Sequence, residues 1–157
     1  MLKIPRKTSA GISIALSVMF FIVCIAGAVA APYISEMFIN ARDNIGLRSE
    51  IGAGGRVYVL VLVYLMIAVA MLADALLFIL LLCVRSGNVF TSKSVALIRG
   101  VSWCCFLMCG IFCALGIYFR LSFIVAFAAV FLGLCLRVVK NVIEEATEIK
   151  SENDLTV

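Results

Sequence analysis

Residues 100–136 form a stretch of 37 residues in which Arg120 is the only charged side chain. As one α-helix it would be about 55 Å long, at about 1.5 Å per residue, whereas the apolar core of a bilayer is about 30 Å thick. One span cannot accommodate that length. Arg120 and Ser122 provide the polar place to turn. The stretch therefore predicts two membrane-crossing helices with a reversal between them.

The composition of the whole chain indicates lipid as its solvent. Of its 157 residues, 65% are hydrophobic and 14% are charged, and the mean hydropathy is +1.21. Soluble domains average about 45–50% apolar and about 25% charged residues. A globule of this size still exposes roughly 30% of the surface of its unfolded chain, so it could not hide the excess. We predict an integral membrane protein.

Four apolar runs are long enough to cross a membrane as helices that satisfy their own backbone hydrogen bonds. We therefore predict an all-α fold, a four-helix bundle integral to the membrane. The predicted spans cover about residues 11–31, 57–84, 95–119 and 121–137, with a polar outer loop at 32–56 and an inner loop at 85–94. Thr91 or Ser92 is the predicted N-cap of the third helix.

The distribution of Lys and Arg predicts the orientation, because cytoplasmic loops carry an excess of these residues. With the N-terminus inside, nine of the 13 lie on the cytoplasmic side and four on the outer side. We expect both termini in the cytoplasm. An alternative stays open, since the apolar run ending in Ala28, Val29 and Ala30 also has the form of a cleavable signal peptide. Cleavage would leave three spans and an external N-terminus.

The last span is predicted to continue beyond the membrane. After Arg137, apolar positions recur at helical spacing up to Ile149, which predicts one helix from about residue 121 to about 150. Its cytoplasmic extension and tail cover 138–157. From Lys140 onward the side chains carry two positive and five negative charges, and Lys140 and Glu144, four residues apart, are expected to pair.

Asp74 is the one charged residue inside the second apolar run. A charged aspartate near the centre of a span costs roughly 2.5–3.5 kcal/mol on insertion scales, so it should face the bundle and find a partner or stay protonated. The candidate partners are Ser13, Ser17 and Ser102. Two interpretations stay open: a proton or cation site, and a structural hydrogen bond between helices.

Three of the seven cysteines, Cys105, Cys109 and Cys113, recur every four residues on one helix face. Thiolates suit soft metals such as copper(I) or zinc. Lipid disfavours thiolates, however, and the chain has neither a histidine nor a Cys-x-x-Cys motif. We interpret these cysteines as small packing side chains and expect no metal and no cofactor.

Sequence signatures of catalysis and of nucleic-acid binding are missing. Without histidine, Ser-His-Asp sites and zinc-protease motifs are excluded, and the glycines at 52–55 lack the Lys and Ser or Thr of a phosphate-binding loop. The basic residues are scattered at the ends of apolar runs, which is how membrane proteins orient themselves. We therefore expect neither an enzyme nor direct binding of nucleic acid.

Two polar stretches carry a family resemblance. Gly87, Phe90 and Thr91 precede the third span, and the chain ends in Glu-Asn-Asp-Leu-Thr-Val at 152–157. In these motifs the chain resembles the YoaS-like domain-of-unknown-function family of small four-span bacterial membrane proteins. The resemblance implies the bacterial cell membrane and cytoplasmic termini. It also implies a neighbouring gene for a Cro/C1-type helix-turn-helix regulator, and it brings no catalytic residue.

Our first hypothesis is a membrane protein that anchors or modulates such a regulator. The residues expected to bind the partner are Phe90, Thr91, Glu144, Glu148, Glu152, Asn153, Asp154 and Leu155. A simpler alternative is that the acidic helix face is only solvated and that the chain end folds back on the Phe90 loop as a cap.

Two further hypotheses belong to other classes. One is a small transporter or permeation subunit that works through Asp74, as a homo-oligomer. The other is a membrane immunity or stress protein whose outer loop, 32–56, meets a toxin or peptide.

Overall fold

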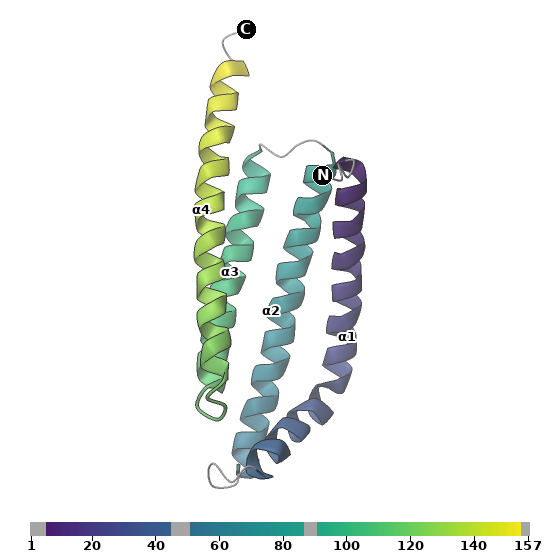
Figure 1. Ribbon diagram of the computed structural model, residues 1–157, viewed down its shortest axis with the longest axis vertical. Helices are drawn as coiled ribbons and strands as arrows, with labels where there is room; N and C mark the ends of the chain where they lie inside the picture. Colours follow the sequence, from purple (N-terminus) through teal and green to yellow (C-terminus); the bar gives the residue numbers. More distant parts are fainter. Residues whose placement is uncertain (1–5, 45–50, 87–90, 155–157) are drawn as a thin grey trace, which may run out of the picture.

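The computed structural model describes residues 6–44, 51–86 and 91–154, with side chains described over 11–41, 51–86 and 91–149. These residues form four α-helices, as predicted (Figure 1). The helices are α1 (Arg6–Asn44), α2 (Ala53–Arg85), α3 (Ser92–Leu115) and α4 (Ser122–Asp154). Each contains a stretch long and apolar enough to cross a membrane, so the predicted all-α four-helix bundle is confirmed.

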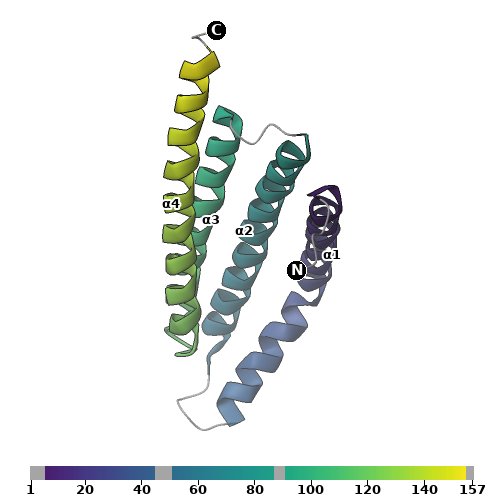
Figure 2. The same cartoon turned by 45° about the horizontal axis from the view of Figure 1, so that its top comes forward.

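The helices run alternately up and down and are arranged in an open row (Figures 1 and 2). Within the described residues, α1 packs on α2, α2 on α3 and α3 on α4, and no other pair of helices is in contact. The bundle therefore does not close on itself. Large apolar side chains cover the exposed helix faces, as a protein surrounded by lipid requires.

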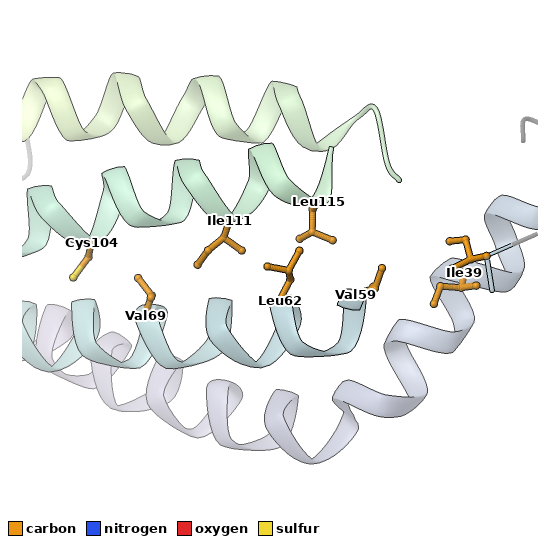
Figure 3. Close-up of a cluster of buried hydrophobic side chains, with 8 residues drawn as sticks. Ile39, Val59, Leu62, Val69, Cys104, Ile111 and Leu115 are labelled. Atoms are coloured by element: carbon orange, nitrogen blue, oxygen red, sulfur yellow. The ribbon is translucent and has the colours of Figure 1, made fainter. Parts of the chain in front are cut away.

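The buried core lies mainly between α2 and α3. Val69 and Cys104 lie at one end of it, and Leu62, Val59, Ile111 and Leu115 continue it toward the α3–α4 turn, where Ile39 and Ile51 also join it (Figure 3). The α3–α4 contact includes a close approach at a glycine. A Cβ atom added at Gly133 would lie 3.2 Å from Cys105 Cβ and 3.3 Å from Phe106 Cζ. The small residue thus lets two helices approach, as is common in membranes.

The predicted reversal near Arg120 is confirmed. Helix α3 ends at Leu115, four residues before the predicted limit of its span at 119, and α4 begins at Ser122. Backbone hydrogen bonds from Phe119 N to Leu115 O (2.9 Å) and from Ser122 N to Phe119 O (3.0 Å) hold the intervening turn. From there α4 is continuous to Asp154, which confirms the predicted extension of the last helix.

The predicted outer loop, 32–56, is wrong over most of its length. Residues 32–44 continue α1 through Pro32, and α2 already begins at Ala53. Proline removes one backbone donor and crowds the preceding turn, which bends a helix without necessarily ending it. Figures 1 and 2 show this bend. The surface that a toxin- or peptide-binding loop would offer is therefore chiefly helical.

Candidate functional sites at the α3–α4 groove and at Asp74

The end of the bundle at which α2 ends and α3 begins is rich in cations, and we call it the basic end. Its described cations are Arg85, Lys93, Arg99, Arg137 and Lys140, against Arg56 and Arg120 at the opposite end. Helix α4 projects past the other three helices at the basic end (Figure 1). We call residues 138–154 the α4 extension.

An aromatic cluster marks the start of the α4 extension. The guanidinium carbon of Arg137 lies 5.2 Å from the ring centre of Trp103 and 5.3 Å from that of Phe106. These two rings meet edge to face, with their centres 6.2 Å apart. Arginine over an aromatic face is a favourable cation–π contact, and Trp and Arg both prefer the membrane–water interface. The apolar part of α4 therefore ends at this cluster.

A groove lies beside the cluster, between the first turns of α3 and the α4 extension. Its volume is about 280 Å³, and it is lined by Ser92, Val95, Ala96, Arg99, Glu144, Thr147 and Glu148. Apolar, hydroxyl and charged side chains all contribute. A groove with this mixed lining suits part of a protein surface, such as a helix end with its side chains.

Glu144 joins the two walls of this groove. It accepts hydrogen bonds from Lys140, one turn earlier on α4, and from Arg99 Nη2 on α3 at 3.4 Å. The hydrogen bond from Lys140 lowers the pKa of Glu144, and the positive charges of Lys140 and Arg99 act in the same direction. The predicted Lys140–Glu144 pair is confirmed. The partner on α3 was missed, because 45 residues separate Arg99 from Glu144.

The proposed partner-binding residues do not all belong to this groove. Glu144 and Glu148 line it, and Thr91 lies at its edge as the N-cap of α3, accepting from Ser94 N at 3.4 Å. Thr91 as a cap is thus confirmed. Sequence reasoning missed the α3 wall, although Ser92, Val95, Ala96 and Arg99 recur at helical spacing. That periodicity was the available signal.

The last residues of the predicted set lie beyond the groove. The backbone of Glu152, Asn153 and Asp154 forms the final turn of α4, which runs on past the start of α3 (Figure 1). The alternative in which the chain end folds back on the Phe90 loop is therefore wrong for these three residues. Phe90 and Leu155 lie outside the described residues.

Asp74 lies at the α1–α2 contact and is 9% exposed. Ser17 Oγ, on α1, donates a hydrogen bond to Asp74 Oδ1 at 2.8 Å, so one of the predicted partners is confirmed. Ser102, another candidate, instead donates to Gly133 O at 2.9 Å. Within the described part of the chain, no Lys or Arg forms an ion pair with Asp74. An ionisable residue inside a membrane segment commonly has a functional role, so Asp74 is a candidate site.

The cysteines of α3 lie at two kinds of position. Cys105 packs against Gly133, whereas the sulfur atoms of Cys109 and Cys113 lie 4.0 Å apart near the end of the helix. Among the described residues, no group of three His, Cys, Asp or Glu side chains is placed to hold a metal ion. The contact with Gly133 gives Cys105 the packing role expected of a small side chain.

Comparison with known protein families assigns the chain to a family. The family model described as a protein of unknown function, DUF2975, matches residues 11–157. The chain belongs to this family. No curated protein and no solved structure matches the chain. Together with the four apolar helices, the family assignment gives a multi-pass membrane protein of a family whose function is unknown.

Proposed function

We propose that this DUF2975 protein anchors or modulates a cytoplasmic helix-turn-helix regulator, which it binds at the α3–α4 groove and along the α4 extension. The observation that carries the proposal is the projection of α4 beyond the bundle, with a groove at its base. The excess of Lys and Arg at the basic end favours the cytoplasm for this end. The α4 extension thus presents itself to soluble proteins.

The dimensions of the α4 extension support a docking role. Its 17 residues, 138–154, give about 25 Å of helix at about 1.5 Å per residue. Val95 and Ala96 supply an apolar patch in the groove, and Arg99 and Glu148 supply charge at its edges. Partner helices commonly place apolar side chains in such a groove while their charges fix orientation.

Charge makes a helix-turn-helix regulator a suitable partner. From Lys140 onward the chain carries two positive and five negative side chains, whereas a DNA-binding domain presents a basic face to phosphates. An acidic helix on that face would compete with DNA. Binding at the membrane would then keep the regulator from its operator, and rearrangement of the bundle would release it.

The test uses a Cro/C1-type regulator, which this proposal expects to be encoded beside the gene. The full-length protein is captured from native membranes in mild detergent, and the co-purified regulator is quantified. We expect the regulator to be retained by the full chain and lost from a chain truncated after Lys150. Operator DNA should displace it, and retention should fall as salt rises.

A matched pair of variants locates the contact. Glu148→Gln alters the groove, whereas Glu145→Gln makes the same charge change on an exposed position of α4 outside the groove lining. We expect the first to reduce retention at least about fivefold and the second less than about twofold, since Glu148 lines the groove that a bound partner would cover and Glu145 does not. Equal retention by the truncated and full chains, at equal expression, would end the proposal.

A second candidate function rests on Asp74. The buried carboxyl, hydrogen-bonded to Ser17, supports a proton- or cation-linked transporter, since ionisable residues inside the membrane commonly mark such pathways. In vesicles with a trapped pH dye, proton flux would be lost in Asp74→Asn and kept after truncation at Lys150. Flux that Asp74→Asn leaves unchanged would leave the carboxyl with a structural role only.

A further inference from the structure

The second half of α1 departs from the course of a simple membrane span. Residues 11–31 already provide about 30 Å of helix at about 1.5 Å per residue, which is enough to cross the apolar core. Pro32 follows, and the helix then turns aside and passes under the start of α2 (Figures 1 and 2). We call residues 32–44 the post-proline segment. It begins at the depth where the apolar core ends.

Other features place this depth at a membrane–water boundary. The rings of Tyr58, near the start of α2, and Tyr118, in the α3–α4 turn, lie 5.8 Å apart at the same end of the bundle. Tyrosine is enriched at the interface, because its ring is apolar and its hydroxyl is polar. Tyr33, the first residue after the proline, is 78% exposed. The three tyrosines thus mark one boundary.

The post-proline segment and the residue before it present three distinct faces. Ala31, Ser35 and Ile39, spaced four apart, are at most 5% exposed and face the bundle, where Ile39 joins the core (Figure 3). A second face carries Tyr33, Ile34, Met37 and Phe38; of these, Tyr33, Met37 and Phe38 are each at least 60% exposed. The third face carries Glu36 and Asn40, one turn apart and exposed.

We infer that the post-proline segment is an interfacial helix that binds the bilayer surface. Tyr33, Met37 and Phe38 lie among the upper parts of the acyl chains, while Glu36 and Asn40 face water. Amphipathic helices of this kind bury their apolar face about 5–10 Å into the boundary between headgroups and acyl chains. Membrane contact explains why three large apolar side chains stay uncovered beside two polar ones.

Lipid is a better occupant of this apolar face than a protein partner. The face continues the lipid-facing surface of the straight part of α1, on which Val29 is 80% exposed. Sequence positions 32–44 contain Glu36, Arg42 and Asp43, a net charge of −1. Burial of apolar area, rather than attraction to anionic headgroups, therefore holds the segment at the membrane. Neutral lipid should suffice.

Single tryptophans test the inference in the full chain. In a Trp103→Phe background, Tyr33→Trp and Phe38→Trp each exchange one exposed aromatic side chain for another. Ile22→Trp, at a 60% exposed position, reports the middle of the straight part of α1, and Asn40→Trp reports the polar face. Each variant, checked as monodisperse by gel filtration, is reconstituted in phosphatidylcholine vesicles whose acyl chains are brominated either near the headgroup or near the terminal methyl.

We expect tryptophans at 33 and 38 to be quenched at least about twofold more by the shallow bromines than by the deep ones, as burial at the boundary requires. Ile22→Trp, about 15 Å from Pro32 along the helix at about 1.5 Å per residue, should show the reverse order, and Asn40→Trp should respond chiefly to acrylamide in the water. Replacing half of the neutral lipid by phosphatidylglycerol should leave these values unchanged.

Three results would overturn the inference. Acrylamide quenching at 33 and 38 equal to that at 40 would place the segment in water. Strongest quenching by the deep bromines would make it part of a longer span. Protection from both quenchers would mean that protein, from a second copy or a bound peptide, covers the apolar face. Tyr33→Trp and Phe38→Trp are independent probes, so loss of one variant leaves the other.

Discussion

The two outer pairs of helices are held together in different ways. The α3–α4 pair combines a close backbone approach at Gly133, a hydrogen bond from Ser102 to Gly133 O, and contacts of Arg137 and Glu144 toward the basic end. The α1–α2 pair is joined by a hydrogen bond from Ser17 to Asp74 inside the apolar part. The α3–α4 pair is thus held by close packing together with polar contacts, whereas the α1–α2 pair is joined by a hydrogen bond to a carboxyl group.

This difference matters because helices surrounded by lipid gain little from hydrophobic burial against one another. Close packing of small residues and polar contacts between helices supply the association instead. The α3–α4 pair should therefore depend mainly on close packing, whereas the α1–α2 pair should respond to whatever removes the partner of Asp74. Four substitutions or pairs of substitutions test this contrast, and we give them in order of expected effect.

The largest effect is expected from Gly133→Leu. A side chain at this position would collide with Cys105 and Phe106, and overpacking typically costs about 1–3 kcal/mol, occasionally more. The free energy of unfolding, from titration of the protein in mild micelles with a denaturing detergent, should fall accordingly. Gly110→Leu is the matched control on α3, because nothing lies within 4 Å of a Cβ there. Similar losses in both variants would contradict the importance of this contact.

A smaller effect is expected at the α1–α2 pair. Ser17→Ala and Asp74→Ala, alone and combined, form a double-mutant cycle for the 2.8 Å hydrogen bond. Hydrogen bonds between membrane helices contribute about 0.6 kcal/mol on average and about 1.7 kcal/mol at most, so the coupling energy should lie in this range. The control cycle pairs Asp74→Ala with Ser102→Ala, which contacts Gly133 instead. Its coupling should be near zero.

A third effect concerns the aromatic cluster at the start of the α4 extension. Arg137→Gln removes the cation that lies over Trp103 and Phe106. Exposed cation–π contacts contribute about 0.5–1 kcal/mol, so the free energy of unfolding should fall by that amount. Arg137→Lys, which keeps the positive charge, should retain part of this contribution to the free energy of unfolding. Loss of the same size from Arg85→Gln, an exposed cation with no such ring contact in the described structure, would show a general charge effect instead.

The smallest effect is expected at Glu144. Its pKa is lowered by Lys140 and then by Arg99, so its contribution is present above the ordinary pKa of glutamate, about 4.3, and is lost as the pH falls through the lowered value. The melting temperature of the natural chain should approach that of Glu144→Gln on acidification. A difference that stays constant down to pH 2 would exclude this ionic origin.

Much of the fold follows from local patterns in the sequence, and the exceptions have physical reasons. The lengths of apolar runs predict the four helices, and a lone Arg120 predicts the reversal. Spacing within one helix predicts Lys140–Glu144, and the cost of a bare carboxylate in lipid predicts a hydroxyl partner for Asp74. Each of these needs only neighbours along one helix or a single unfavourable group.

What could not be predicted depends on how helices turn relative to one another. The Arg99–Glu144 pair and the groove exist because contact at Gly133 fixes the rotation of α3 against α4. The helix beyond Pro32 was missed because a proline followed by charges is typical of a loop. The continued helix lets Ile39 pack into the core, a contact that local sequence patterns do not predict.

The open row of helices has a mechanical consequence. Among the described residues, α1 contacts only α2 and α4 contacts only α3, so the first and last helices are linked through the α2–α3 interface. A displacement that begins at Asp74 reaches the α4 extension only if α2 and α3 move together, and coupling of this kind travels through packed side chains. Gly100 admits Leu76 so closely that an added Cβ would lie 2.9 Å from Leu76 Cδ1. In the described structure this α2–α3 interface is therefore the route by which a displacement of α1 reaches α4.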